Sequence, residues 1–259
     1  MTDVTLVIHD GRATLTMVPE SDRRPPVIDL AMLDRLDEAL AAVEKTLGRP
    51  GEARVAILRS ASSSSFCAGG SIDALQTLDR STMDRWIERG HEVFLRLERL
   101  PLPTIAVVAG HALGGGLELA LACDLIYATE NARFAQPETR LGFVTGWGGG
   151  RRLAERVGTS RARELAYTGR AVGADEAAAM GLALYAGSAS DVEERLEQVV
   201  RSIEEGSAVA VAAMKEIACA VVPGAAVRSL ELERRHSREV VEHPETVRRV
   251  REFFARRRR

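Results

Sequence analysis

The segment from residue 104 to residue 121 joins a buried strand, a cluster of glycines and a helix with no linker between them. Thr104 to Val108 reads TIAVV, an apolar and β-branched run that is typical of a strand buried on both faces. The turn from Gly110 to Gly116 contains four glycines, and the Ala/Leu-rich helical segment after it carries a single acid, Glu118. Glycines let backbone amides approach a ligand closely, and a helix N-terminus attracts negative charge. The segment therefore predicts a site that stabilises an anion.

A second isolated acid, Glu138, follows soon after the first. It comes after Pro137, at the end of a short segment that begins with a strand-like run at Asp124. Residues 142–150 contain five glycines, too many for the interior of a helix or a strand. Two isolated acids beside a glycine turn indicate acid/base groups next to the anion-stabilising site.

Composition narrows the classes of protein to which this chain can belong. Its 259 residues are 46% apolar and 28% charged, which favours a folded domain with a sizeable core, with or without a small appendage. The formal net charge of −2 argues against a general nucleic-acid binder. The arginine run at Arg256 to Arg259 is read as a solvated terminus in preference to an anion-binding tail.

The three cysteines, Cys67, Cys123 and Cys219, have no metal-ligand spacing. Their odd, sparse number favours buried thiols in a reducing compartment, and we expect a cytoplasmic protein without a structural metal. The N-terminal residues show no signal peptide. The most apolar window, residues 104–128, is interrupted by a histidine, two acids and the glycines, so we expect a core segment and no membrane span.

Hydrophobic periodicity predicts an α/β fold. A hairpin should open the chain around Asp10-Gly11, and Asp29 should cap the first helix. Strands are expected at 4–8, 13–18, 54–59, 104–108, 124–128 and 182–185. Helical spacing occupies 29–47, 75–100, 152–157, 161–168, 174–180, 191–205, 207–221, 226–241 and 244–255. Strands alternate with helices only up to about residue 185, so we expect an α/β core in residues 1–200 and a helical C-terminal region in residues 201–259.

Several motifs, in order along the chain, resemble the crotonase (enoyl-CoA hydratase/isomerase) superfamily. They are Phe66-Cys67-Ala68-Gly69-Gly70, Gly110 to Ala120, Cys123-Asp124, Phe134 to Glu138, Leu141-Gly142, the helix end from Leu165 to Gly169, the run from Ala174 to Leu182, and the tail from Phe253 to Arg257. Each motif alone is weak, but their joint order and spacing extend over nearly the whole chain.

The resemblance implies a spiral of ββα units with a helical C-terminal appendage, assembled as a homotrimer or homohexamer. It implies an acyl-CoA thioester as substrate, with coenzyme A as part of that substrate and no further cofactor. By motif position, Gly70 and Gly115 are expected to donate the two amides of an oxyanion hole, and Glu118 and Glu138 to be the catalytic acids. Substrate-binding positions are expected at Ala68, Ile72 and Trp147.

These residue types suit the addition of water to an enoyl thioester. Addition develops negative charge on the thioester oxygen, and two fixed amides stabilise it. One glutamate would activate water and the other would exchange a proton at the α-carbon. Each acid also has a structural reading, because Glu118 and Glu138 could both be ordinary first-turn acids of helices.

The sequence departs from the common pattern of the superfamily at several positions. Gly70 stands where alanine is usual, Ser71 replaces a frequent aspartate, Thr145 replaces a frequent proline, and Trp147 is bulky. The donor at position 70 is a backbone amide, so the oxyanion hole should survive. The changes at 145 and 147 leave acyl size and reaction subtype open.

We interpret the chain as an enoyl-CoA hydratase. The alternatives are a decarboxylase or double-bond isomerase with the same oxyanion hole, and a non-catalytic acyl-CoA-binding or RNA-binding relative. The presence of both acids favours hydration.

Overall fold

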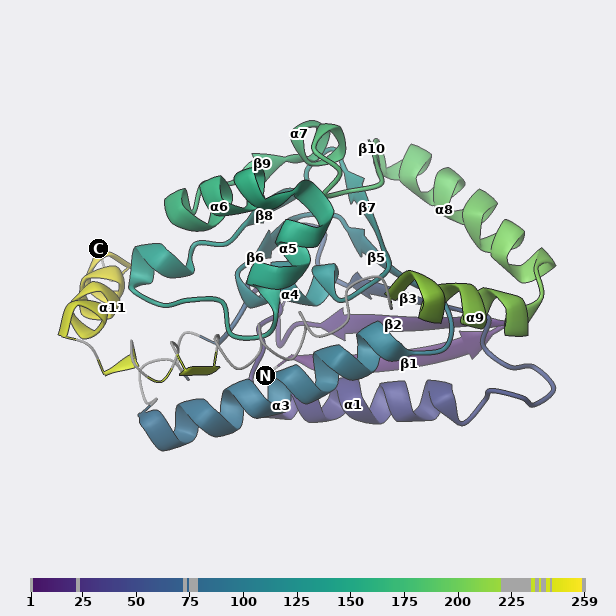
Figure 1. The fold of residues 1–259 in the computed structure, drawn as a ribbon, viewed down its shortest axis with the longest axis horizontal. Helices are drawn as coiled ribbons and strands as arrows, with labels where there is room; N and C mark the ends of the chain where they lie inside the picture. The colour runs from purple at the N-terminus through teal and green to yellow at the C-terminus, as the bar shows by residue number, and fades with distance from the viewer. Residues whose placement is uncertain are drawn as a thin grey trace.

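Two β-sheets form the centre of the computed structural model, with helices packed around them (Figure 1). The structure describes residues 2–21, 24–71, 74, 79–219, 234–235, 238, 241–242 and 244–257. The expected substrate-binding residue Ile72 and most of the helix expected at 226–241 lie outside the described residues.

The strands and helices alternate along most of the chain. The strands are β1 (Asp3–His9), β2 (Arg12–Val18), β3 (Val55–Ser60), β4 (Ser65–Cys67), β5 (Thr104–Val108), β6 (His111–Leu113), β7 (Leu125–Thr129), β8 (Arg133–Ala135), β9 (Val172–Gly173) and β10 (Tyr185–Gly187). The helices are α1 (Leu30–Glu44), α3 (Arg80–Arg99), α4 (Gly115–Leu121), the 3-10 helix η1 (Glu138–Leu141), α5 (Gly149–Val157), α6 (Thr159–Thr168), α7 (Ala174–Ala179), α8 (Ala189–Glu205), α9 (Ala208–Cys219) and α11 (Pro244–Arg257).

The larger sheet has the strand order β1-β2-β3-β5-β7-β10. Its first two strands form the predicted antiparallel hairpin, in which Asp10 (φ 48°) and Gly11 (φ 76°) both take the left-handed conformation that a tight hairpin turn requires. The remaining neighbours pair in parallel. Asp29 caps α1 as expected, because its Oδ1 accepts a hydrogen bond of 2.8 Å from the amide of Met32.

The smaller sheet, β4-β6-β8-β9, makes the fold a spiral. A strand of the large sheet leads into a strand of the small sheet and then into a helix, as in β3-β4-α3 and β5-β6-α4. The strands β4, β6 and β8 are parallel neighbours. The predicted α/β spiral of ββα units is confirmed.

Side-chain alternation gives the large sheet two buried faces. In β3, Ala56 and Leu58 join the main core, whereas Val55 and Ile57 point to the opposite face. That second face is covered by α8 through Val192, Leu196 and Val200. Burial on both faces explains why the central strands read as continuous apolar runs.

Three details differ from the sequence-based expectation. The glycine-rich turn contains a strand, β6, because its backbone pairs with β4 and β8. The last strand of the large sheet is β10, at the end of the expected segment 182–185 and beyond it. Helix α5 begins at Gly149, inside the glycine-rich segment.

Helix α9 is joined to the core through a buried polar contact. Lys215, whose side chain is 9% exposed, places Nζ 2.8 Å from Oδ2 of Asp124 and donates to the carbonyl of Leu102 at 2.9 Å. The same Oδ2 accepts hydrogen bonds from the amide and hydroxyl of Thr104 at 2.7 and 2.9 Å. One carboxylate therefore links the start of β5 to α9.

We predict that Asp124→Ala lowers the free energy of unfolding by about 3–5 kcal/mol, because it leaves the Lys215 ammonium buried without its partner. The matched control is Asp3→Ala, which removes an exposed pair with Arg35 and should cost under about 1 kcal/mol. Denaturant unfolding of both variants measures the difference. Equal losses would contradict a structural role for Asp124.

Candidate active site

The carboxyl ends of three adjacent parallel strands meet at one edge of the small sheet. The chain leaves β4 toward Gly70, leaves β6 toward Gly115 and α4, and leaves β8 toward Glu138. Ligands of α/β sheets bind outside this end of the strands. The spiral therefore gathers segments separated by some 70 residues of sequence, from Gly70 to Glu138, at a single site.

The backbone of Gly70 directs its amide away from the neighbouring strand. Ile28 donates to the carbonyl of Gly69 at 2.8 Å, and Ser71 donates to the carbonyl of Ile28 at 2.8 Å, which makes Gly70 the bridge partner of Ile28. In extended backbone, the groups of the bridge residue itself point to the opposite side. Gly70 also lines the cavity described below.

Gly115 lines the same cavity as Gly70. It is the first residue of α4, where backbone amides have no partner within the helix. A Cβ placed on Gly69 would lie 3.1 Å from the amide nitrogen of Gly115, so the two glycine segments are in direct contact. The Gly69-Gly70 segment therefore lies against a helix N-terminus, an environment that suits an anion.

Glu118 is a buried carboxylate with several amide donors. Its side chain lies in the first turn of α4 and the residue is 2% exposed. Oε1 accepts hydrogen bonds from the amides of Trp147 and Gly149, both at 2.8 Å, and Oε2 accepts from Gly146 at 3.4 Å. Hydrogen bonds from several amides favour the ionised form of a carboxylate. The glycine-rich segment is thus a binding loop for this acid.

Glu138 begins η1 and lines the same cavity as Glu118. A Cβ placed on Gly114 would lie 3.2 Å from Oε1 of Glu138, so this carboxylate is next to the turn that presents Gly115. Gly114 itself has φ 53° and ψ −123°, a conformation that strongly favours glycine.

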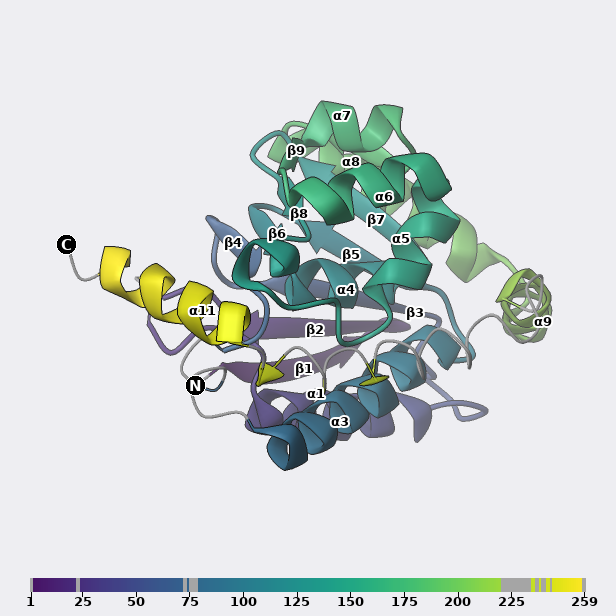
Figure 2. The same cartoon turned by 60° about the vertical axis from the view of Figure 1, so that its left-hand side comes forward.

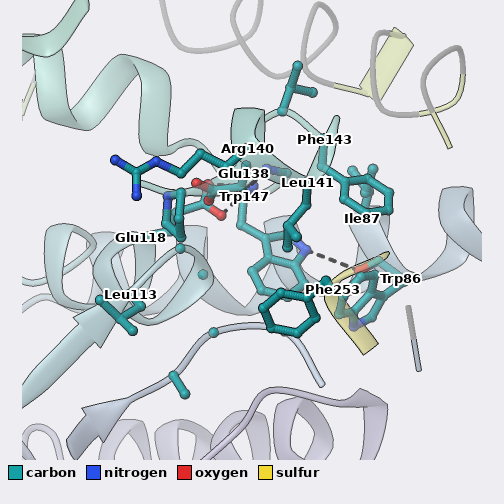
Figure 3. A pocket seen from close by; sticks show the side chains of 18 of the residues that line it. Trp86, Ile87, Leu113, Glu118, Glu138, Arg140, Leu141, Phe143, Trp147 and Phe253 are labelled. Carbon is teal, nitrogen blue, oxygen red and sulfur yellow. Dashed lines mark hydrogen bonds between the residues drawn. The ribbon is translucent and has the colours of Figure 1, made fainter. Parts of the chain in front are cut away.

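The two acids and two glycines line one cavity of about 640 Å³, shown from close by in Figure 3. Trp86 and Trp147 form part of its wall, edge to face at 4.9 Å between ring centroids. The indole nitrogen of Trp147 donates to the carbonyl of Trp86 at 3.3 Å. Other lining residues come from α3, from η1 and the segment after it, and from α11: Met83, Ile87, Arg140, Leu141, Phe143, Val144, Glu252, Phe253 and Arg256.

The expected site residues within the described part of the chain converge on this cavity: Ala68, Gly70, Gly115, Glu118, Glu138 and Trp147. The sequence did not predict that Trp86 lines the site, because its periodicity assigned this residue only to the apolar face of a helix. Its signal was the glycine at position 70, since a Cβ there would lie 2.5 Å from Cη2 of Trp86. Nothing in the sequence except the glycine content of residues 142–150 indicated that amides of this loop donate hydrogen bonds to Glu118.

The described residues also bear on metal binding, thiol reactivity and membrane-spanning helices. Among them, no group of three or more His, Cys, Asp or Glu side chains could hold a metal ion. Burial raises the pKa of the Cys67 and Cys123 thiols to about 12, so both are unreactive as nucleophiles. No helix in the described ranges has the length and apolar character needed to cross a bilayer.

Solved structures establish the fold class. The chain superposes on an enoyl-CoA hydratase from Mycobacterium avium subsp. paratuberculosis with a TM-score of 0.81 and 25% identity, covering 96% of this chain and 97% of the other. An enoyl-CoA hydratase from Bacillus halodurans gives a TM-score of 0.87 at 21% identity, covering 96% and 99%. The spiral is the crotonase fold.

Sequence comparison then gives the family. The chain belongs to the enoyl-CoA hydratase/isomerase family, whose model matches residues 23–259. It is 36% identical over 191 residues to probable enoyl-CoA hydratase 2, mitochondrial, of Arabidopsis thaliana; the match covers 74% of this chain and 64% of that protein. It is 35% identical over 193 residues to the short-chain-enoyl-CoA hydratase of Clostridium acetobutylicum, covering 74% of each.

We predict that Gly70→Ala destabilises the protein by about 1–3 kcal/mol, because the new methyl group overlaps Trp86. The matched control is Gly146→Ala in the same cavity, where an added Cβ meets only Ile87 at an ordinary 3.7 Å. Thermal unfolding compares the two. Trp86→Leu should relieve the overlap, so the double variant with Gly70→Ala should lose less stability than the sum of the single variants. Additive losses would rule out this contact.

Proposed function

We propose that the protein is an enoyl-CoA hydratase, which adds water across the double bond of a 2-enoyl-CoA thioester. One observation carries the proposal: two glycines at the motif positions of an oxyanion hole and two glutamates line the same cavity. The names of the relatives support it, and so does the match to the family.

In the proposed reaction, a water oxygen forms a bond to the β-carbon while one glutamate accepts the water proton. The π electrons of the double bond move toward the thioester, and its oxygen becomes an enolate oxygen. The amides of Gly70 and Gly115 would donate to that oxygen, and losing one such donor typically costs about 3–4 kcal/mol of barrier. The enolate then collapses as the α-carbon takes a proton from the second glutamate. The product carries a hydroxyl group on the β-carbon and a new hydrogen on the α-carbon.

The surroundings of the two acids support different roles. Three amides donate to Glu118 and favour its ionised form, so we assign Glu118 as the base that activates water. Glu138, next to the glycine turn, would then protonate the α-carbon. After one turnover the proton taken from water must return to Glu138, through solvent or between the two carboxyl groups.

The apolar wall is proposed to hold the acyl chain. Ala68 lies directly after β4, beside the first amide donor, and Trp147 lies against Gly115, where a Cβ would overlap its ring. Both line the cavity. An acyl group extending from the thioester carbon would therefore contact these two residues. Coenzyme A enters as part of the substrate, and the proposal requires no metal or redox cofactor.

We predict that Glu118→Gln and Glu138→Gln each lower the hydration rate by at least about 100-fold, because each removes an acid/base group. Thioester binding should change little, since the proposed donors to the thioester are backbone amides. The double variant should be little slower than either single variant, because the two acids act on one addition. Loss of the ultraviolet absorbance of the conjugated thioester measures the rate.

The same assay separates hydration from its alternatives. Wild-type protein is given 2-enoyl-CoA, 3-enoyl-CoA and malonyl-type acyl-CoA, and the products are identified by mass. Turnover of 3-enoyl-CoA or malonyl-type acyl-CoA that is abolished by Glu118→Gln, with Glu138→Gln silent, would favour a double-bond isomerase or decarboxylase. Binding without turnover of any substrate would favour a non-catalytic relative. Activity that is lost on chelation and restored by a divalent metal would contradict the cofactor proposal.

We also propose that the protein assembles as a homotrimer or homohexamer through a surface that includes α9. This helix lies at the periphery of the fold (Figure 2) and exposes apolar side chains: Val209, Met214 and Ile217 are 80%, 62% and 60% exposed. Burying such a face against a second copy of the chain would remove apolar area from water.

Sedimentation at micromolar concentration should therefore give the mass of three or six chains. Met214→Glu places a charge on the proposed interface and should shift the population to smaller species. The control Tyr167→Glu alters another exposed large residue, on α6. A monomeric wild type would contradict the proposal, as would equal effects of both substitutions.

A further inference from the structure

A partly buried ion-pair cluster is joined to the loop that binds Glu118. Glu98, in the last turn of α3, accepts hydrogen bonds from two consecutive arginines of α5. Arg151 donates to it at 2.7 and 2.8 Å, and Arg152 donates through Nε at 2.9 Å and Nη2 at 2.5 Å. The side chains of Arg151 and Arg152 are only 11% and 3% exposed. Burial opposes the ionisation of Glu98, but the two arginines outweigh it and hold its pKa below the ordinary value.

The two arginines differ in what else they contact. Arg151 donates its Nη1 to Glu155 on the outer side of α5, at 2.8 Å. Arg152 donates its Nη1 to the backbone carbonyl of Trp147, at 2.5 Å. Only the second contact reaches the loop from Gly146 to Gly149, so the pair provides a natural comparison within one cluster.

The residue whose carbonyl Arg152 holds is also a donor to Glu118. The amides of Trp147 and Gly149 donate to Glu118, and the Trp147 carbonyl lies between them in sequence. The side chain of Arg152 also packs against Gly148, which has φ 91° and whose Cβ would lie 2.5 Å from Nη1. The Trp147 carbonyl belongs to the peptide between residues 147 and 148. Holding it therefore fixes the peptide plane that lies between the amides of Trp147 and Gly149. The glycine-rich loop would otherwise be free to take many conformations.

We propose that Arg152, oriented by Glu98, is a positioning residue that holds the amides of Gly146, Trp147 and Gly149 on the Glu118 carboxylate. The inference rests on the proposed function, in which Glu118 acts as the ionised base. A displacement of about 1 Å in a catalytic group can cost about 100-fold in rate. The cluster therefore acts on the reaction through the loop and touches no substrate.

Other charged groups share the cavity with Glu118. Glu138 and Arg140 of η1 line the same cavity, as do Glu252 and Arg256 of α11. Helix α3 contributes only apolar side chains to the lining. None of these groups is changed by a substitution at position 152.

The test compares Arg152→Gln with Arg151→Gln. Both variants remove one of the two arginines on Glu98, but only Arg152→Gln frees the Trp147 carbonyl. For Arg152→Gln we expect kcat to fall by about 10- to 100-fold, while the Kd for a saturated acyl-CoA changes by less than about 3-fold. The pH of half-maximal rate on the acidic side should rise by about one unit, because fewer amides favour the ionised form of Glu118. Arg151→Gln should leave that pH unchanged.

A second measurement does not depend on turnover. Infrared difference spectra between each protein and its Glu118→Gln counterpart follow the protonated carboxyl group of Glu118 across pH. We expect this signal to appear at higher pH in Arg152→Gln than in wild type or Arg151→Gln. If wild type fails to hydrate enoyl-CoA, the proposed function is wrong, and the infrared comparison still decides whether Arg152 positions the loop.

Equal infrared titrations in wild type and Arg152→Gln would overturn the proposal, and so would equal shifts in the two arginine variants. If Arg152→Gln does not fold, Arg152→Lys replaces it. Lysine keeps the charge beside Glu98 but lacks the forked donors needed to reach the carboxylate and the carbonyl together. It should show the same shift to higher pH, and an unchanged titration would count against the proposal.

Discussion

The burial of one carboxylate constrains much of this structure. An isolated charge in an apolar interior costs far more than the net stability of a domain, so it must be surrounded by oriented dipoles. Glu118 obtains them from backbone amides of a single loop. At position 149 the packing leaves no room for a side chain, because a Cβ there would lie 2.7 Å from Cγ of Glu118.

The loop in turn depends on the spiral around it. It connects η1 to α5, and α5 is tied to α3 through Glu98. Helix α11 is joined to the start of the same loop, because the hydroxyl of Thr246 donates a hydrogen bond to the carbonyl of Gly142 at 2.9 Å. The segments near the acid are thus held by elements from the middle and the end of the chain. The amide donors that Glu118 needs are thus held in place by contacts of the loop with α3, α5 and α11.

Much of the fold could be predicted because long elements carry strong periodicity. The continuous apolar run of β5 and the spacing of α1 and α8 are local signals, and the structure confirms them. The small sheet had no such signal. Its strands β4, β6 and β8 have three residues each, too few for alternation, and β6 lies inside a glycine turn. They exist because the spiral supplies partners on either side.

The sequence predicted only those site residues that belong to a sequence motif. The glycines and the two acids are separate in sequence, but each belongs to a recognisable motif, and the structure brings them to one cavity. Trp86 and Arg152 belong to no such motif. Their importance comes from a contact across the fold, to Gly70 and to the Trp147 carbonyl, and no local pattern records such a contact.

The contact between Gly70 and Trp86 has a consequence for how relatives of this protein can diverge. The amide at position 70 is independent of the side chain there, so volume can be exchanged between this loop and α3 without removing the polar donor. A lineage that acquires alanine at position 70 must reduce the residue at position 86, and one that acquires tryptophan at 86 must keep glycine at 70. The two positions should therefore covary among homologues of this fold. The shape of the apolar wall can drift in this way while the polar groups at the strand ends stay in place.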